Sequence, residues 1–398
     1  MSIGWNTSTK THIHTCPNTT ACVQCSGKKG TSCRMQFRYF IVAAILVCVS
    51  FELIFHHYLN RVKPNETPGY YHCKDAPRDR YSGIKNETIQ YGRIKSGRKY
   101  AVFGSSIHDR VSTNYAFDLP LTAMAWKRIG FDSIIIIVGD PQQHKQQRWI
   151  QYLMDTLTDE DHIVVIVLKN VPACKATSIS QVSRLFAASL LNYDKNDATM
   201  RDIYLITADA DIWPIAKDFF VLPPGMDILH GNIGKIHRGN LVAIHAPLSY
   251  VGMSIRTWYD IMTQSGSLPM PNTTDEIVNY FGDSFRDNVT HGGRGWGIDQ
   301  VMISLRLHQW RLNNRKGTQR IYVYQRQFGA DRIDRANWPK APIDISRAID
   351  SHILKNCYQA NQWKRLMPLV AQLHTDTDSK KWSERYSQHF NELVIASE

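Results

Sequence analysis

The sequence of 398 residues lacks most of the short motifs that mark familiar catalytic or metal sites. It contains no HExxH zinc motif or paired metallohydrolase cluster, no P-loop and no G-x-S-x-G nucleophile elbow. These absences argue against a metal hydrolase, a P-loop nucleotide-binding protein and an α/β-hydrolase. Internal repeats and low-complexity tracts are also absent. With 43% apolar and 21% charged residues, the composition is that of an ordinary globular protein.

The sequence also lacks a dense basic stripe with interleaved aromatic residues, although its formal net charge is +12. Nucleic-acid binding uses such a stripe, so we expect no nucleic-acid partner. A modest excess of positive charge suits an anionic small molecule, acidic glycans or a membrane surface.

Long hydrophobic runs are absent except for one, residues 39–55, which read YFIVAAILVCVSFELIF with Glu52 as the sole charged side chain. Extended by its amphipathic flank to residue 59, the run reaches the ~20 residues that a membrane-spanning helix needs. We therefore predict a transmembrane signal anchor at 39–59. A cleaved signal peptide is the alternative, but a long polar segment precedes the run and no small-x-small cleavage site follows it.

The charges that flank this run predict its orientation. Four cations precede it closely and two follow it, so the 1–38 tail should be cytosolic and the rest lumenal, as in a type II Golgi membrane protein. Residues 60–98 are polar and proline-containing, which is typical of a stem. Sequons on the lumenal side support this topology weakly, because sequons often arise by chance; they begin at Asn65, Asn86, Asn272 and Asn288.

Cysteines are few beyond the predicted span: only Cys73, Cys174 and Cys357 lie there. Three cysteines in an oxidising compartment predict one disulfide and one free or intermolecular thiol, and the sequence leaves the pairing open. The tail contains Cys22 and Cys25 in a CxxC spacing but no second CxxC, so an unstructured, lipidated tail is favoured over a zinc site.

From residue 99 onward, short β-rich runs alternate with helical patterns. Buried strands separated by helices of this kind form parallel sheets covered on both faces, so the predicted fold class is α/β with a doubly wound, mainly parallel sheet. We expect a catalytic domain at 99–345 and a helical segment at 346–398 packed on it. The predicted strands are 100–104, 133–138, 163–168, 202–207, 226–229, 241–244 and 320–324, and the predicted helices are 115–129, 142–157, 178–191, 253–263 and 298–310.

The central chemical feature is Asp209-Ala210-Asp211, which directly follows the predicted strand at 202–207. The sequence holds two other D-x-D segments, at 159–161 and 376–378, but both lie in polar surroundings. In open α/β sheets, ligands bind at the carboxyl ends of the strands. Two carboxylates there, together with water and diphosphate oxygens, predict a site for Mn²⁺ or Mg²⁺. A turn in which the two aspartates cap backbone amides is the structural alternative.

Residues 178–215 contain Ser178-Ile-Ser-Gln-Val-Ser-Arg184-Leu-Phe, then an amphipathic helix, then Tyr204-Leu-Ile-Thr-Ala-Asp209-Ala-Asp211-Ile-Trp-Pro-Ile. This segment resembles the GT-A glycosyltransferases, particularly glycogenin and its relatives, and the resemblance extends over roughly 99–303. It implies a GT-A-like fold in which Asp209 and Asp211 bind the metal and Asp209 and Arg184 contact the nucleotide-sugar donor. A surface helix charge is the alternative role for Arg184.

The same resemblance extends to Trp296-Gly-Ile-Asp299-Gln300, similar to the D-Q pair that opens a helix near the acceptor in that family. It implies Asp299 and Gln300 as catalytic residues, while a carboxylate that stabilises a helix N-terminus is the alternative for Asp299. It also implies a histidine as a further metal ligand, for which we choose His352, followed by His374 and His389. By position, the first strand and turn would face the nucleotide base, through Phe103, Gly104 and Ser105.

These features together predict a metal-dependent glycosyltransferase of the Golgi lumen. The expected partners are a nucleotide-sugar donor, preferably a UDP-sugar, a glycan or glycoprotein acceptor, and the membrane through one helix. The alternative is a non-catalytic glycan-binding or scaffold protein that keeps the fold. Donor sugar, acceptor and stereochemical outcome stay open, although the resemblance to glycogenin favours retention.

Overall fold

The computed structural model describes residues 88–397 except 109, 195, 201, 233, 239–240, 265, 283–284, 286–294, 315–316, 326–330 and 341. The predicted tail, the predicted anchor at 39–59 and most of the predicted stem lie outside the described residues. In the part of the chain that is described, no helix combines the length and the apolarity that crossing a membrane requires.

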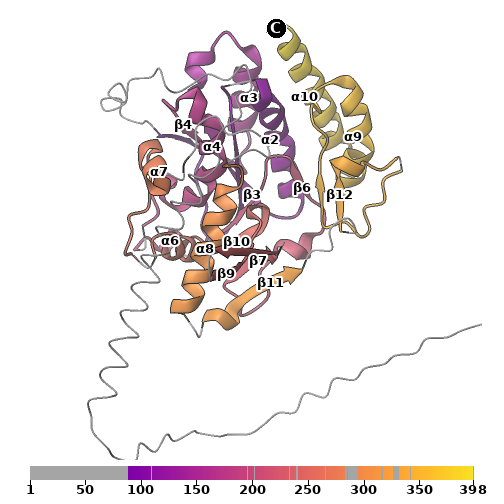
Figure 1. Cartoon of the computed structure of the whole chain (residues 1–398). Coiled ribbons are helices and arrows are strands. Elements are labelled where there is room, and N and C mark those ends of the chain that lie inside the picture. Colours follow the sequence, from indigo (N-terminus) through magenta and orange to yellow (C-terminus); the bar gives the residue numbers. More distant parts are fainter. Residues whose placement is uncertain are drawn as a thin grey trace, which may run out of the picture. The chain divides into compact units, whose positions relative to one another are not determined.

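A mixed sheet forms the centre of the described region (Figure 1). Eight described strands pair in the order β1-β4-β3-β2-β5-β10-β7-β11. Strands β4, β3, β2 and β5 are mutually parallel, as the sequence predicted, and β11 is parallel to β7. The strands are β1 (Thr88–Tyr91), β2 (Lys99–Ser106), β3 (Asp132–Val138), β4 (Ile163–Leu168), β5 (Tyr204–Thr207), β7 (Ile228–Asn232), β10 (Val251–Ser254) and β11 (Ile321–Gln325).

Helices cover both faces of this sheet because its central strands are apolar on both sides. β3 reads DSIIIIV with every residue buried, the pattern of a strand enclosed between two layers. One face packs against α2 (Arg110–Arg128) and α3 (Arg148–Thr158). The other packs against α4 (Ala173–Val182), α6 (Ile255–Met262), α7 (Thr274–Phe281) and α8 (Ile298–Asn313). The doubly covered α/β architecture therefore matches the prediction.

The second half of the sheet differs from the prediction because its direction reverses. β10 is antiparallel to both β5 and β7, and the edge strand β1 is antiparallel to β4, so the sheet is mixed rather than mainly parallel. The sequence pattern predicts a helix from Met253, but in the structure Met253 still belongs to β10. Ser254 ends the strand and caps α6 by accepting a hydrogen bond from the amide of Thr257. The predicted strand at 241–244 exists as β9 (Leu241–Ile244), but it pairs with β8 (Lys235–Arg238) outside the main sheet.

The predicted helix at 178–191 is also broken in the structure. It consists of α4, the 3-10 turn η4 (Ser183–Phe186) and the short α5 (Ala187–Leu190). Arg184 belongs to this turn, and its side chain, only 8% exposed, donates to the carbonyl of Ala208 just after β5.

A separate three-stranded sheet follows the main sheet and carries much of the candidate site. Its order is β12-β13-β6, with β13 parallel to β12 and antiparallel to β6. The strands are β6 (Ile212–Pro214), β12 (Arg332–Asp334) and β13 (Asp350–His352). These strands come from places far apart in the chain, so the sheet joins the segment after Asp211 to the C-terminal region.

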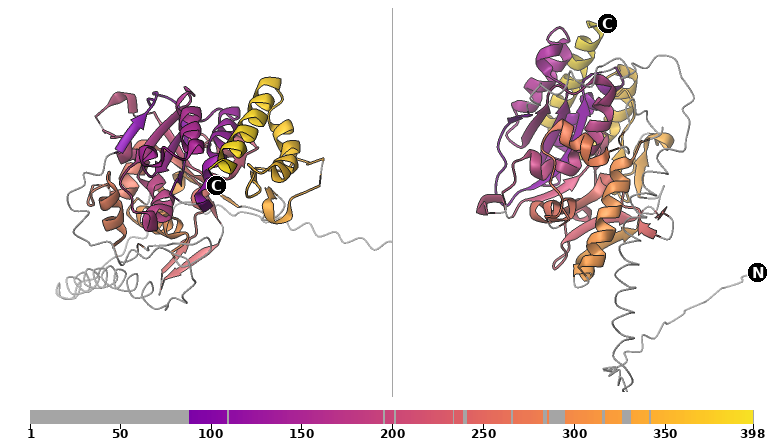
Figure 2. Two further views of the ribbon diagram at one scale, coloured as in Figure 1. Left: turned by 90° about the horizontal axis from the view of Figure 1, so that it is seen from above. Right: turned by 60° about the vertical axis from the view of Figure 1, so that its left-hand side comes forward.

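Two C-terminal helices, α9 (Ala360–Leu373) and α10 (Thr377–Ile395), lie side by side next to α2 (Figure 1). In the left view of Figure 2 they gather on one side of the sheet. Tyr386 of α10 stacks on Phe117 of α2 and donates its hydroxyl to the Phe117 carbonyl at 3.0 Å. These buried aromatic contacts make the C-terminal helices part of the core.

The described cysteines separate into one bonded and one free residue. Cys174 forms a disulfide whose partner lies outside the described residues. Cys357 is a free, buried thiol that donates to the carbonyl of Leu354. Of the two described cysteines, Cys357 is therefore the free one.

Candidate functional site

The segment Asp209-Ala210-Asp211 lies directly after β5, at the carboxyl end of the four parallel strands. Backbone and side-chain hydrogen bonds fix its path: Ala208 N donates to Val102 O at 2.8 Å. The Thr122 hydroxyl on α2 donates to Ala210 O, and Trp213 Nε1 donates to the same hydroxyl oxygen at 3.0 Å. The segment is thus fixed between β2 and α2 at the edge of the sheet where α/β proteins bind ligands.

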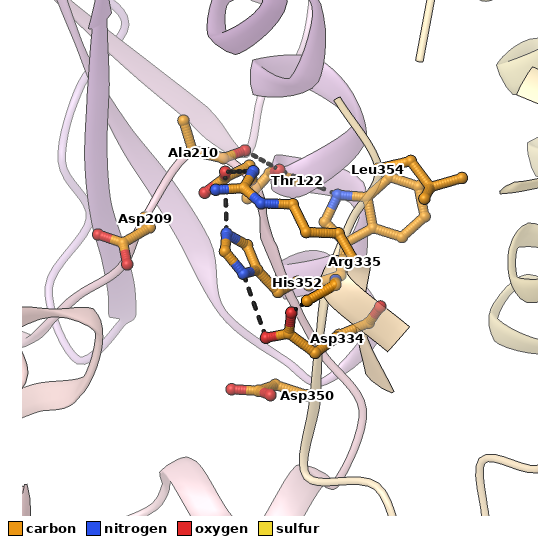
Figure 3. A network of polar contacts seen from close by, with 12 residues as sticks. Thr122, Asp209, Ala210, Asp334, Arg335, Asp350, His352 and Leu354 are labelled. Atoms are coloured by element: carbon orange, nitrogen blue, oxygen red, sulfur yellow. Dashed lines mark hydrogen bonds and ion pairs between the residues drawn. The ribbon is translucent and has the colours of Figure 1, made fainter. Parts of the chain in front are cut away.

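The small sheet aligns the side chains around Asp211. Antiparallel pairing of β13 with β6 places His352 opposite Ile212, the residue after Asp211. Parallel pairing of β12 with β13 places Asp334 opposite His352. His352 consequently lies between two carboxylates, with Nε2 at 3.2 Å from Asp211 Oδ2 and Nδ1 at 3.4 Å from Asp334 Oδ2 (Figure 3).

Asp211 is a buried carboxylate, and the side chains of Arg335 and His352 both contact one of its oxygens. Arg335 Nη1 donates to Asp211 Oδ2 at 2.7 Å, and the His352 contact falls on the same oxygen. Burial alone would raise the pKa of Asp211, but the hydrogen bond and charge of His352 and the charge of Arg335 outweigh it and lower the pKa to about 2. Asp211 is therefore ionised at any physiological pH.

Asp209 faces a different partner. Its carboxylate pairs with Nη1 of Arg184, and in Figure 3 it lies apart from the group around His352 and Arg335. Arg184 Nη2 also donates to Asp299 Oδ2 at 2.8 Å. The Asp209 side chain is 32% exposed, whereas Arg184 is 8% and Asp299 1% exposed. Asp209 is thus the most exposed member of a row of three charged side chains, Asp209, Arg184 and Asp299.

The structure brings Asp299 and Arg184, two residues predicted from the sequence, into direct contact. Asp299 begins α8, but its carboxylate is buried, bonded to Arg184 and also accepting from the amide of Gln300 at 2.8 Å. Arg184 lies between the two acids and pairs with both, which fixes the position of Asp209. The Gln300 amide N–H supports Asp299, and the Gln300 carbonyl accepts from Ser304 at 2.6 Å.

The three residues predicted to face a nucleotide base lie on β2. Phe103 is fully buried in the core on the α2 side, and Ser105 is 3% exposed and donates to the Ser106 carbonyl. A Cβ at position 104 would collide with the carbonyl oxygen of Ile136, so Gly104 is required for the close pairing of β2 with β3. The side chains of Phe103 and Ser105 are thus buried, and the role of this strand end toward a nucleotide stays a prediction.

Of the three histidines considered as metal ligands, the structure brings only His352 to Asp211. His374 is buried where α9 ends. His389 is 51% exposed on α10 and contacts Glu392. His352, the first choice from the sequence, is thus the one of the three that lies beside Asp211.

Several charged residues around Asp211 escaped the sequence analysis. Asp334 ends the short strand β12 and Arg335 follows it. Both lie in the run Asp331-Arg-Ile-Asp-Arg335, whose alternating charges around one buried isoleucine were the available signal. Asp118 on α2 is fully buried, and its Oδ1 has no hydrogen-bond partner among the described residues. Burial, followed by the negative charge of Asp211, raises the pKa of Asp118 well above its ordinary value.

The residue types at Asp211 fit a divalent cation that takes further ligands from a bound molecule. Carboxylate oxygens suit Mn²⁺ and Mg²⁺, and neutral imidazole is a common metal ligand. However, the described residues contain no group of three or more histidine, cysteine, aspartate or glutamate side chains arranged to hold a metal ion. Asp209, the third predicted ligand, is turned to Arg184. Asp211 and His352 thus offer an open pair of ligands rather than a closed metal cage.

Comparison with known proteins gave weak similarity to glycosyltransferases. No protein-family model and no curated protein matches the chain. The apo-form glycosyltransferase GlyE of Streptococcus pneumoniae TIGR4 is similar, with a TM-score of 0.33 and 12% identity, over 75% of this chain and 62% of that one.

Two structures of Drosophila beta1,4-galactosyltransferase 7 are also similar. The catalytic domain in complex with xylobiose has a TM-score of 0.28 and 12% identity, over 67% of this chain and 78% of that one. A mutant in complex with manganese, UDP-Gal and xylobiose has a TM-score of 0.28 and 14% identity, over 66% of this chain and 72% of that one. Scores of this size establish neither a shared fold nor a shared activity, so function has to be argued from the residues of the chain itself.

Proposed function

We propose that this protein is a metal-dependent glycosyltransferase that transfers a sugar from a nucleotide diphosphate donor to a hydroxyl of a glycan or glycoprotein. A UDP-sugar is the preferred candidate donor. One observation carries the proposal: the D-x-D segment follows a parallel strand at the ligand-binding edge of the sheet, and His352 lies against its second aspartate. Of the sequence's D-x-D segments, this is the one with both features.

The residues around Asp211 would have different roles in binding the donor. Asp211 and His352 would hold Mn²⁺ or Mg²⁺, which neutralises the charge that grows on the diphosphate as the sugar–phosphate bond breaks. Asp334 orients the imidazole ring through Nδ1, leaving Nε2 directed at the site. Asp209, positioned by Arg184, is the more exposed carboxylate and is placed to contact the donor or its metal.

The proposal includes a Golgi-lumenal location with one membrane anchor. It is supported by the apolar run at 39–59, the cations before it and the sequons after it. A lumenal transferase of this kind would use nucleotide sugars and act on glycans or glycoproteins.

A panel of nucleotide sugars tests the proposal directly. The full-length protein, purified in mild detergent, is incubated with each donor in Mn²⁺ and in EDTA, and release of nucleoside diphosphate is measured. We expect hydrolysis of at least one donor in Mn²⁺ and none above background in EDTA. No hydrolysis of any donor in Mn²⁺ would argue against a transferase.

A non-catalytic, glycan-binding protein is the second candidate. It is favoured by one observation, namely that each aspartate of the pair is already neutralised by an arginine. Titration calorimetry with UDP in the presence of Mn²⁺ separates the two. Metal-dependent binding of UDP supports the transferase, whereas glycan binding without any UDP binding supports the alternative.

A further inference from the structure

The two aspartates of the D-x-D segment are each paired with an arginine, and the two arginines differ in how firmly they are held. Arg184 donates to Gln181 O, Ala208 O and Asp299 Oδ2 as well as to Asp209. Arg335 donates to Asp211 Oδ2 and, among the described residues, has no other hydrogen bond or ion pair. Arg184 is therefore a fixed part of the structure, whereas Asp211 is the one described residue whose side chain holds Arg335 at this place.

The position of Arg335 follows from the end of β12. Asp334 accepts a hydrogen bond from the amide of Ala336 and caps the 3-10 turn η10 (Arg335–Asn337), so Arg335 is the first residue of a turn directly beside the site. Its side chain is 15% exposed and reaches an Asp211 side chain that is 7% exposed. The guanidinium thus donates to Asp211 Oδ2, the same oxygen that contacts His352 Nε2.

A divalent cation bound by Asp211 and His352 would have to share Asp211 Oδ2 with this guanidinium. Two cations at one carboxylate oxygen repel each other, and in a partly buried place this repulsion is weakly screened. A guanidinium released from a carboxylate is well suited to bind a phosphate, because its fork of N–H donors matches phosphate oxygens.

We propose that Arg335 exchanges partners: it pairs with Asp211 when the site is empty and with the diphosphate of the donor when a divalent cation binds. This inference rests on the proposed function, since it requires a nucleotide diphosphate and a cation at Asp211. It assigns Arg335 a role in binding the donor, and it gives the residue two opposite effects. Arg335 weakens binding of the cation alone and strengthens binding of the nucleotide once the cation is present.

Calorimetry on the full-length protein measures both effects with Arg335→Gln. Mn²⁺ is titrated alone, and UDP is then titrated at saturating Mn²⁺. We expect Mn²⁺ to bind roughly five- to tenfold more tightly to the variant, within the usual range of coupling between two sites. We expect UDP to bind roughly tenfold more weakly, the usual effect of losing a hydrogen bond to a charged group.

Two further variants serve as controls. Arg385→Gln removes one positive charge from an exposed position on α10 and should change neither affinity. Arg335→Lys keeps the positive charge but removes the forked N–H donors of the guanidinium. Its Mn²⁺ affinity should therefore stay near wild type, while UDP binding is partly weakened. Thermal unfolding by circular dichroism is measured for each variant, and affinities are compared at a temperature where all are folded.

The outcomes separate this inference from the proposed function. If the wild type binds Mn²⁺ and UDP but Arg335→Gln leaves both affinities unchanged, or weakens both, the exchange of partners is wrong and the proposed function stands. If the wild type binds neither, both are overturned. Tighter Mn²⁺ binding together with weaker UDP binding supports the exchange.

Discussion

Asp211 and Asp118 are two buried carboxyl groups beside α2 whose pKa values shift in opposite directions. Burial raises the pKa of Asp118, and the negative charge of Asp211 raises it further. Asp211 experiences the same burial, but the hydrogen bond and charge of His352 and the charge of Arg335 lower its pKa to about 2. At the scale of the residue, the partners of a carboxyl group and not its burial decide whether it carries charge.

These shifts predict opposite effects of pH on stability. The pKa of Asp118 is higher in the folded protein than its unfolded value of 3.8. The stability that the protonated carboxyl group contributes is therefore fully present below pH 3.8 and is lost as the pH rises through the folded-state pKa. Asp118→Asn should therefore increase the free energy of unfolding at pH 7 by roughly 1 kcal/mol, with a smaller gain at pH 4. Urea unfolding in EDTA at the two pH values measures this.

Asp211 behaves in the reverse way. Its folded-state pKa is lowered, so its contribution is present above 3.8 and is lost as pH falls through about 2. Asp211→Asn should lower the free energy of unfolding at pH 7, by roughly 1 to 3 kcal/mol, and the loss should shrink as the pH approaches 2. A larger loss at low pH than at neutral pH would contradict the assignment of Arg335 and His352 as its stabilising partners.

At the scale of the element, the strands β12 and β13 position the residues around Asp211, and a buried ion pair fixes these two strands. Arg332 on β12 binds Asp350 on β13 through two hydrogen bonds of 2.7 Å, and the Tyr250 hydroxyl donates to the same carboxylate. Asp350 is 0% and Arg332 15% exposed. Through Tyr250, the pair connects the small sheet to the segment just before β10. Asp350 lies two residues before His352 on β13.

Removing one partner of this pair should destabilise the protein strongly. Asp350→Asn leaves the Arg332 guanidinium without its counter-charge in a buried place, and we expect a loss of about 3 to 5 kcal/mol in the free energy of unfolding. Urea denaturation measures the loss, with Asp155→Asn on the exposed face of α3 as the matched control. The double variant Arg332→Met, Asp350→Leu should recover part of the loss. Equal stability of Asp350→Asn and the control would contradict a structural role for the pair.

Local sequence patterns predicted the elements well where a single run of residues decides the structure. β3 and β4 are continuous runs of buried aliphatic residues, and α3 buries Trp149, Ile150, Leu153, Met154 and Leu157 at helical spacing. The short strands β6, β10, β12 and β13 carry three or four residues each and have no local period to read. Their pairing partners, and not their own residues, make them strands.

At the scale of the whole molecule, the candidate site joins residues that no local pattern connects. The D-x-D segment could be predicted because it follows a recognisable strand. His352 lies 141 positions beyond Asp211 and Arg335 lies 124 beyond it, and both reach Asp211 through the small sheet. His352 could be chosen only through the resemblance to a known family. Arg335 could not be predicted, because an arginine next to a short strand of three residues looks like any surface arginine in the sequence. The contact between Asp299 and Arg184, 115 positions apart, could not be predicted from the sequence either, because no local pattern connects the two residues.

The central claim is that Asp211, at the end of β5, binds the metal of a nucleotide-sugar transferase. Mn²⁺-dependent donor hydrolysis by Asp211→Asn, compared with Asp159→Asn from the exposed D-x-D segment at 159–161, tests it most directly. The account predicts that Asp211→Asn loses activity roughly a hundredfold or more while remaining folded, and that Asp159→Asn keeps wild-type activity. Equal activity of the two variants would contradict it.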